Sequence, residues 1–302
     1  MEIRRLALYA NITSMEEEER EKLRKIEKSR ESCQMKKWFW FLLIPVVCLF
    51  FSFSFQTSTY AVSNQPIHWG FSKGKNGQQA EAGKAYDEAL KKYGGVYKGN
   101  PHDKVLYLTF DNGYENGYTA KILDVLKEEK VPAIFFVTGH YLKSEPDLVK
   151  RMVKEGHIIG NHSWGHPDFT QVSDEKLREE LEKVKTETKR ITGQKEMKYL
   201  RPPRGVFSER TLQLAKQEGY IDVLWSLAYY DWDINRQQGT QYAYDNIMKQ
   251  LHPGAIMLLH TVSKDNANAL QKVIQDAKKQ GYKFKSMDDF MKKEHPATQE
   301  KD

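Results

Sequence analysis

Residues 105–110 read VLYLTF, a short apolar run that predicts a buried strand. Further apolar runs predict strands at 133–137, 158–160, 197–200, 221–226, 255–259 and 282–285. Amphipathic stretches between them predict helices at 120–130, 147–155, 173–192, 208–218, 242–250 and 266–280. Such alternation predicts a parallel sheet with helices outside it. About seven units without a Gly-x-Gly-x-x-Gly fingerprint favour an α/β protein of the (β/α) barrel type over a dinucleotide-binding fold.

Polar side chains follow five of the predicted strands. In chain order these segments are Asp111-Asn112-Gly113, Asn161-His162, Arg201-Pro202-Pro203-Arg204-Gly205, Tyr230-Asp231-Trp232 and His260-Thr261. The carboxyl ends of barrel strands meet at one rim, where barrel enzymes build their active sites. One such strand end could arise by chance, but five indicate a shared site.

Two imidazoles four residues apart, His162 and His166, are candidate metal ligands. Gly165 and Pro167 argue against a helix between and after them, so a loop is predicted to present both rings. A histidine pair of this kind is by itself more often part of an ordinary surface loop. Its position among the other strand ends is what favours a metal site.

Metal-assisted hydrolysis is the chemistry that this set of residues favours. A divalent ion held by His162 and His166 lowers the pKa of bound water and polarises a carbonyl. We expect Asp111 to accept the proton of water, His260 to protonate the leaving group, and an ion pair of Arg201 with Asp231 to orient Asp111. Taken singly, each has a structural alternative: a turn at 111–113, a hydrogen-bonded histidine, and a structural ion pair.

The five segments resemble the motifs of the polysaccharide deacetylase family, also called carbohydrate esterase family 4, with its NodB homology domain. They occur in the family's order over residues 101–290, with the first motif as Thr109-Phe110-Asp111-Asn112-Gly113 and the last as Leu258-Leu259-His260. The resemblance implies a distorted (β/α) barrel, a zinc-like ion, and hydrolysis of N-acetyl groups on amino sugars. It also implies that Asp111 is the base, His162 and His166 are ligands, His260 is the acid, and Arg201 and Asp231 position the base.

The resemblance extends to the substrate pocket. Trp232 is expected to line it, and the backbone N–H of Arg204 is expected to help hold the oxyanion. Pro203 and Gly205, from the same motif as Arg204, and Tyr114, just after the first motif, are further candidate substrate-binding residues.

One residue departs from the family pattern. The second aspartate of the first motif, which is a metal ligand in the family, is Asn112 here. An amide offers a carbonyl oxygen without a negative charge, so Asn112 is kept as a third candidate ligand and weaker metal binding is expected. Zinc is the expected ion, and cobalt or another divalent ion is an alternative.

Asn112 and the segments 204–208, 69–71 and 260–263 resemble one subgroup, the delta-lactam-biosynthetic de-N-acetylases of endospore-forming bacteria. The subgroup implies action on peptide-free muramic acid in spore-cortex peptidoglycan. Such a sugar carries a lactyl carboxylate, and a guanidinium binds carboxylates in two-pronged fashion, so Arg204 is the candidate partner. The alternatives are a deacetylase of chitin-like N-acetylglucosamine polymers, or an inactive glycan-binding module with Asn112 as its lesion.

Upstream of the barrel the chain divides by composition. Residues 1–34 form a polar extension, and 35–61 begin with Met-Lys-Lys followed by an apolar run, which predicts an export signal or a membrane anchor. Because Met35 is a natural initiator, translation of residues 1–34 stays open. We expect an arm at 62–103 that packs on the barrel, a catalytic domain at 104–291 and a polar tail at 292–302.

Charge and cysteine usage restrict the partners. The chain of 302 residues has 47 Lys and Arg against 41 Asp and Glu, a net charge of +6 that suits an anionic wall or membrane surface. No nucleic-acid motif is found, and Cys33 and Cys48 both precede the predicted barrel. The apolar segment predicts a protein exported across the cytoplasmic membrane, and the resemblance implies the cell wall or forespore envelope as its location. It would act as a monomer on peptidoglycan and meet the membrane only through its N-terminal segment.

Overall fold

The structure, a computed structural model, describes residues 19–22, 24–25, 28 and 62–294. The chain divides into two units, Met1–Ala61 and Val62–Asp302, and the described residues of the first are helical. Among the residues that the structure describes, no helix is long and apolar enough to cross a membrane. The predicted signal or anchor at 35–61 lies outside the described residues, as does most of the predicted extension at 1–34.

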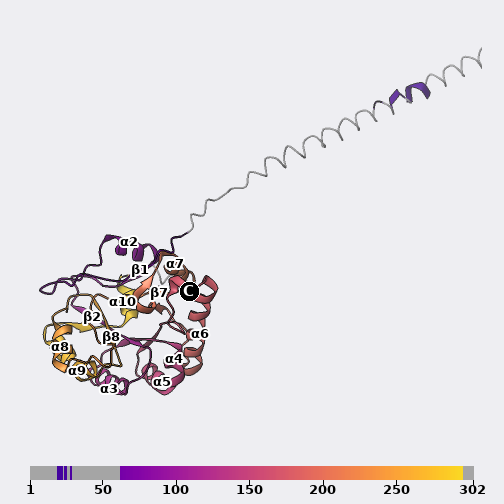
Figure 1. Cartoon of the computed structure of the whole chain (residues 1–302). Helices are drawn as coiled ribbons and strands as arrows, with labels where there is room; N and C mark the ends of the chain where they lie inside the picture. Colours follow the sequence, from indigo (N-terminus) through magenta and orange to yellow (C-terminus); the bar gives the residue numbers. More distant parts are fainter. Residues whose placement is uncertain (1–18, 23, 26–27, 29–61, 295–302) are drawn as a thin grey trace, which may run out of the picture. The chain divides into compact units, whose positions relative to one another are not determined.

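The second unit is built on one curled parallel sheet (Figure 1). Its strand order is β7-β5-β4-β3-β2-β8, and β9 pairs with β2 as well. The strands are β2 (Val105–Asn112), β3 (Ala133–Val137), β4 (Ile158–Asn161), β5 (Tyr199–Leu200), β7 (Ile221–Asp222), β8 (Ala255–His260) and β9 (Lys283–Phe284). The prediction of a distorted α/β barrel of about seven parallel strands is confirmed.

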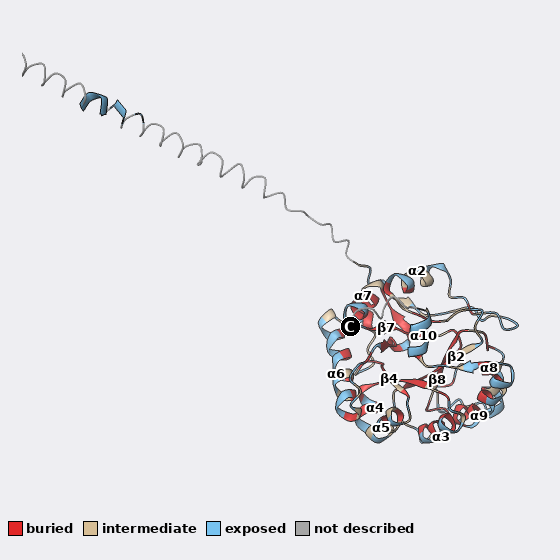
Figure 2. Ribbon diagram, turned by 180° about the vertical axis from the view of Figure 1, so that it is seen from behind, coloured by how far each residue is buried: buried red, intermediate tan, exposed pale blue. Residues whose placement is uncertain are grey.

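Helices cover the outside of the sheet, and their outer faces are exposed while the strands are buried (Figure 2). They are α3 (Thr119–Glu129), α4 (Gly139–Ser144), α5 (Pro146–Lys154), α6 (Asp174–Thr192), α7 (Glu209–Gln217), α8 (Thr240–Met248) and α9 (Lys264–Lys279). Serine side chains cap two of these helices: Ser173 and Ser208 accept backbone N–H groups at the starts of α6 and α7. Gly193 ends α6 in the left-handed conformation.

The two faces of β2 contact different cores, because successive side chains of a strand point to opposite sides. Leu106, Leu108 and Phe110 pack into the layer between sheet and helices. Tyr107 packs into the second core with side chains from β3, β8 and α10 (Met287–Glu294). This alternation places Asp111 on the side of Tyr107, inside the barrel, and Asn112 on the side of the helices.

The predicted strand at 221–226 is wrong beyond Asp222. Val223 makes a single parallel bridge with Val96, and Leu227 makes one with Met257 of β8. The segment therefore changes partners within a few residues, since it crosses from the β5 side of the barrel to β8. It completes the barrel as a bent segment instead of a strand.

The N-terminal arm fixes itself to the barrel by a second, two-stranded sheet. Within it β1 (Ile67–His68) pairs antiparallel with β6 (Val206–Phe207), and α2 (Lys84–Tyr93) follows along the chain. Leu90 and Tyr93 of α2 are buried in a cluster with Phe207. The short 3₁₀ turns are η1 (Phe169–Gln171) and η2 (Pro203–Gly205).

Two helices were missed from the sequence, α4 and α10. The predicted polar tail at 292–302 overlaps α10, which runs to Glu294 and buries Phe290 and Met291 in the core inside the barrel. Its polar outer face is what makes this segment resemble a tail in composition. Residues 295–302 lie outside the described part of the chain.

Candidate active site

The register of the sheet brings the predicted base and the predicted acid together. Asp111 at the end of β2 aligns with His260 at the end of β8, on the neighbouring strand. Both residues line the same groove at the carboxyl ends of the strands. Asp111 is almost fully buried, and the His260 side chain is 22% exposed, so the acid is the more accessible of the two.

The predicted ion pair of Arg201 with Asp231 is wrong, because Arg201 pairs with Asp111 instead. Arg201 Nη1 donates to Asp111 Oδ1 at 2.7 Å, and its Nε donates to the carbonyl of Val223 at 2.9 Å. The guanidinium is fully buried and lies over the Phe136 ring at 4.2 Å. Burial, the largest single effect, acts to raise the pKa of Asp111, but Arg201, His162 and His260 together outweigh it and the pKa is lowered, which keeps this carboxylate charged at neutral pH.

Asp231 instead pairs with His260. Its Oδ1 accepts from His260 Nδ1 at 2.7 Å, and its Oδ2 accepts the backbone N–H of the same residue at 2.8 Å. The Nδ2 of Asn266 also donates to Oδ2, at 2.6 Å, which fixes the carboxylate. Burial acts to lower the pKa of His260, but Asp231 outweighs it and raises the pKa, so the imidazole favours its proton-carrying form.

The loop that carries His162 and His166 is held by side-chain oxygens. Ser163 and His166 have φ angles of 64° and 58°, in the left-handed region that is costly for residues other than glycine. Asn161 Oδ1 accepts the N–H of Ser163 at 2.9 Å, and Ser163 Oγ accepts that of His166 at 2.9 Å. Glu180 Oε2 from α6 accepts the N–H of Gly165 at 2.6 Å. The predicted loop is confirmed, and these bonds offset its strained backbone.

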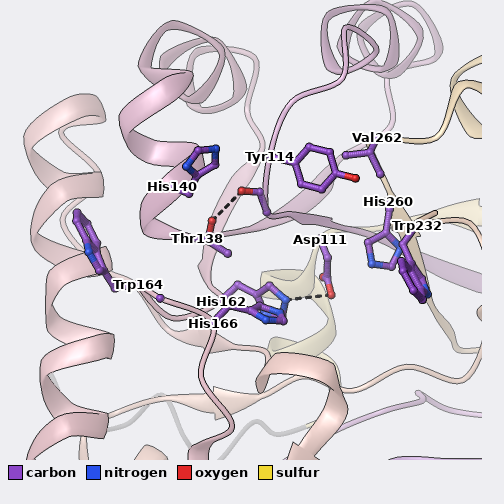
Figure 3. A pocket seen from close by; sticks show the side chains of 12 residues that line it. Asp111, Tyr114, Thr138, His140, His162, Trp164, His166, Trp232, His260 and Val262 are labelled. Carbon is purple, nitrogen blue, oxygen red and sulfur yellow. Dashed lines mark hydrogen bonds and ion pairs between the residues drawn. The ribbon is translucent and has the colours of Figure 1, made fainter. Parts of the chain in front are cut away.

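The two histidine rings meet edge to face, with centroids 4.8 Å apart (Figure 3). His162 Nδ1 donates to the carbonyl of Arg201 at 2.8 Å, which leaves Nε2 with its lone pair in the neutral ring. That Nε2 faces Asp111 Oδ2 at 3.5 Å. Burial lowers the pKa of His162, and burial together with His162 lowers that of His166 to about 4. Both rings are therefore neutral at physiological pH, the form that binds metals.

Of the three predicted ligands, His162 and His166 line the groove, whereas Asn112 lines neither of its cavities and lies on the helix side of β2. Asn112 Nδ2 donates to Thr261 Oγ1 at 2.9 Å, and its buried Oδ1 has no hydrogen-bond partner among the described residues. An amide oxygen is a hard donor in chemical type, but here it does not share the groove with the two rings. Within residues 62–294 and the short described helix, no three His, Cys, Asp or Glu side chains form a metal-binding group. Asn112, the third predicted donor, is an amide and is not one of these residue types.

Two adjoining cavities, of about 690 Å³ and 830 Å³, form one groove through the site. Five residues line both cavities and mark their junction: Asp111, His162, His166, Trp232 and His260. Figure 3 shows the two ligand histidines on one side of Asp111, and His260 with Trp232 on the other. The structure therefore brings these predicted strand-end residues to one place.

Three comparisons with known proteins agree with this geometry. Residues 98–223 match the family model described as polysaccharide deacetylase. The chain is 57% identical over 231 residues to the peptidoglycan-N-acetylmuramic acid deacetylase PdaA of Bacillus subtilis, a match that covers 76% of this chain and 88% of PdaA. The chain belongs to the polysaccharide deacetylase family.

Solved structures extend the family assignment to the fold. The structure of Bacillus subtilis PdaA, a family 4 carbohydrate esterase, superimposes with a TM-score of 0.75 at 56% identity, and covers 76% of this chain and 98% of that one. A family 4 carbohydrate esterase from Bacillus anthracis gives a TM-score of 0.66 at 58% identity, with coverage of 77% and 99%. This chain is therefore a carbohydrate esterase of family 4 in sequence and in fold.

The predicted substrate-binding residues of this family 4 esterase separate in the structure. Tyr114 and Trp232 line the groove, with Trp232 52% exposed, and Arg204 and Gly205 line its larger cavity. Pro203 is buried beside them and is not among the residues that line either cavity.

Close packing explains the glycine of the 203–205 turn. A Cβ on Gly205, whose φ is 66°, would meet Trp225 and Trp69 at about 3 Å. The turn therefore lies close against the two tryptophans at Gly205, while the neighbouring Arg204 is exposed.

Several groove residues of this deacetylase were missed from the sequence. Thr138, His140 and Trp164 line the smaller cavity. Thr138 follows β3 directly, just as the predicted site residues follow their strands. Its position at a strand end is therefore a sequence signal that could have identified it. Trp69 and Lys73 line the larger cavity, but they come from the arm before the barrel, where strand alternation gives no signal.

Proposed function

We propose that this protein is a hydrolase that removes N-acetyl groups from muramic acid residues of peptidoglycan. The observation that carries the proposal is the charge arrangement of the groove. An ionised carboxylate, Asp111, and a proton-carrying imidazole, His260, lie on neighbouring strands of a cavity that also contains Arg204. The likeness to the muramic acid deacetylase of Bacillus subtilis supports the same substrate.

The reaction divides between the two groups. Asp111 takes a proton from water as the water oxygen attacks the acetyl carbonyl carbon, and His260 gives its proton to the sugar nitrogen as the C–N bond breaks. Acetate and a free amine are the products. Arg201 keeps Asp111 ionised, and Asp231 keeps His260 protonated and oriented, so both are positioning residues.

We propose that His162 and His166 hold a divalent ion, zinc, and that the Asn112 side chain turns toward the groove to add a third donor. When bound, such an ion polarises the carbonyl and lowers the pKa of water. The neutral state of both histidines supports this assignment, as does the unpartnered Oδ1 of Asn112. Because this third donor carries no charge, we propose that the ion is held more weakly than by two histidines and an aspartate.

Arg204 is the proposed partner of the lactyl carboxylate of muramic acid. It has a φ of 59° and lies next to Gly205 in the turn that forms part of the larger cavity. Its guanidinium has no ion pair among the described residues, so it is free to bind a carboxylate of the substrate. We further propose that its backbone N–H helps to hold the oxyanion.

The biological setting belongs to the proposal as well. We propose that the enzyme acts as a monomer outside the cytoplasmic membrane. Residues 35–61 would direct it there as an export signal or a membrane anchor. Its substrate would be peptide-free muramic acid of the spore cortex, and the freed amine and the lactyl carboxylate of one sugar are the two groups that a muramic delta-lactam joins. Two observations support it: the apolar run after Met-Lys-Lys, and the resemblance of residues 69–71, 112, 204–208 and 260–263 to delta-lactam-forming enzymes.

Acetate release by the full chain tests the proposal. Peptide-stripped peptidoglycan and chitin oligomers are compared, each with and without a chelator. We expect release from the stripped peptidoglycan and its loss with the chelator. Release from chitin oligomers alone would assign the enzyme to N-acetylglucosamine glycans. Absence of release from both by metal-loaded protein would make it a glycan-binding module.

The Asn112→Asp variant tests the metal part independently of activity. A carboxylate adds a negative charge to the donor set, so we expect zinc or cobalt to bind at least about tenfold more tightly. Calorimetric titration measures this directly. Asn116→Asp is the matched control, since Asn116 bonds the carbonyl of Val262 nearby and is not a candidate ligand. Equal affinities of wild type and Asn112→Asp would contradict Asn112 as a donor.

A further inference from the structure

The two halves of the groove differ in charge. Lys73 and Arg204 line the larger cavity, where the only acidic lining residue is Asp111, and Arg201 already pairs with that carboxylate. The smaller cavity is lined by no lysine or arginine, although it shares the same catalytic residues. Among the described lining residues, lysine and arginine therefore lie on one side of the reacting centre, whereas Lys143 lies 4.9 Å from the Trp164 ring centroid without lining the smaller cavity.

Neither cation of the larger cavity is neutralised within the protein. Lys73 and Arg204 take part in none of the ion pairs among the described residues. Burial, together with the charge of Lys249, lowers the pKa of Lys73, as expected for an ammonium group in surroundings that already carry positive charge. A bound anion would relieve this repulsion.

The arm that brings Lys73 is fixed directly to the turn of Arg204. The backbone N–H of Trp69 donates to the carbonyl of Gly205 at 2.8 Å, and its indole Nε1 donates to the carbonyl of Trp225 at 3.1 Å. The Trp69 ring packs edge to face on Tyr97 and Trp225. These contacts lock the arm and the turn together, so that Lys73 and Arg204 belong to one wall with a defined geometry.

The remaining lining suits a sugar ring. Phe71, Trp225, Tyr230 and Trp232 contribute aromatic surface to the same cavity, and the rings of Tyr230 and Trp232 lie 4.8 Å apart. Aromatic walls with a few charged groups are typical of sites that bind an apolar ring face and orient its polar substituents. On the opposite side, Tyr114, His140 and Trp164 provide aromatic lining without a formal cation.

We propose that the larger cavity is an anion-selective sugar subsite in which Lys73 of the N-terminal arm is a second specificity-determining cation beside Arg204. This inference rests on the proposed function and deepens it. The glycan would lie across the groove with its carboxylate-bearing substituent toward the arm. A neutral neighbouring sugar would occupy the smaller cavity beside Trp164. Substrate selection would then depend on a segment outside the barrel and its strand ends.

The test compares Lys73→Gln with wild type on two substrates, peptide-stripped peptidoglycan and a neutral chitin oligomer. A lost charge-assisted contact is expected to raise KM for the anionic glycan about tenfold while kcat stays within about twofold. KM for the neutral oligomer should hardly change. Lys75→Gln is the matched control, because Lys75 is an exposed lysine of the same arm that does not line the cavity. An equal effect on both substrates, or an equal effect of both variants, would overturn the proposal.

A binding measurement separates this inference from the proposed reaction. Calorimetric titration of a muramic acid disaccharide and its N-acetylglucosamine analogue uses the full chain and needs no turnover. Lys73-dependent binding of the anionic sugar without acetate release would leave the subsite standing and remove the proposed function. If the enzyme releases acetate from muramic glycan but Lys73→Gln keeps the preference for the anionic sugar, the proposed function would stand and the subsite proposal would be overturned.

Discussion

Two buried pairs of side chains set the protonation states of the site. Asp111 is kept ionised by Arg201, whereas Asp231 keeps the proton on His260. Base and acid are thus tuned in opposite directions by two separate buried pairs, with their side chains on neighbouring strands. A hydrolase needs both states at the same pH, which neither residue would keep if burial acted alone.

Asp231→Asn is predicted to shift the basic limb of the pH profile to lower pH. Asp231 raises the pKa of His260 against burial, and Asp111 adds a smaller effect in the same direction, so removal of the Asp231 charge lowers that pKa. The acid must be protonated, so kcat/KM falls as pH rises through this pKa. At pH 7 we expect a loss of about 10²-fold, measured as the pH dependence of kcat/KM.

Asp233→Asn is the control for this prediction. Asp233 lies two residues away in the same loop and bonds the backbone N–H of Asn235, without contact to His260. Its profile should match that of wild type. An Asp231→Asn enzyme with less activity but an unmoved basic limb would show that Asp231 supports only structure.

Asp222 gives a second residue-scale prediction, this time on stability. Its carboxyl is buried at the end of β7, has no side-chain partner among the described residues, and burial raises its pKa well above the usual range. The folded state therefore holds one more proton than the unfolded state at intermediate pH, and stability falls as pH rises through that interval. We expect Asp222→Asn to stabilise the protein by about 1–2 kcal/mol at pH 8 and by little at pH 4.

Urea unfolding of wild type and Asp222→Asn at a series of pH values measures this difference. Asp245→Asn is the matched control, because Asp245 is an exposed side chain of α8. A stability difference that is constant with pH would mean that Asp222 stays ionised in the folded protein.

At the scale of elements, the ligand loop depends on a buried residue of α6. Glu180 accepts the N–H of Gly165 and also pairs with Lys176 at 3.2 Å. We predict that Glu180→Ala weakens zinc or cobalt binding about tenfold and costs about 1–3 kcal/mol of stability, because a backbone donor loses its acceptor in a strained loop. Glu180→Gln keeps an acceptor oxygen and should lose less of both.

Titration calorimetry and urea unfolding check this prediction, with Glu179→Ala as the control. Glu179 is the neighbouring residue on α6, is partly exposed, and pairs only with lysines of the same helix among the described residues. Unchanged metal affinity in Glu180→Ala would show that the loop holds its shape without this bond.

The elements also show which parts of the fold and of the site could be predicted from the sequence. Apolar runs predicted the barrel because buried parallel strands are almost continuously apolar, and polar strand ends located Asp111, His162 and His260. The pairing of Arg201 with Asp111 joins the end of β5 to β2, strands that β4 and β3 separate in the sheet, and no local pattern contains this contact. Two-residue strands such as β1 and β6, and the six-residue α4, are too short for periodicity to show.

At the scale of the whole molecule, arm and barrel form one binding surface. The arm contributes Trp69, Phe71 and Lys73 to a cavity whose catalytic residues come from strands β2 and β8. Substrate preference and catalysis are therefore carried by different parts of the chain. This division allows the charge of the arm wall to change without altering the pairs that hold Asp111 and His260.

The final prediction concerns the salt dependence that follows from this charge distribution. The chain carries a net charge of +6. Two of its cations, Lys73 and Arg204, line the larger cavity beside the reacting centre and have no ion pair among the described residues. Attraction of an anionic glycan is screened as the Debye length falls from about 10 Å at 0.1 M salt to about 3 Å at 1 M, whereas a neutral oligomer feels little of it. We expect KM for peptide-stripped peptidoglycan to rise several-fold between these salt concentrations while KM for chitin oligomers stays nearly constant, with kcat unchanged for both. Parallel salt dependence for the two substrates would mean that the field of the arm wall plays no part in selecting the glycan.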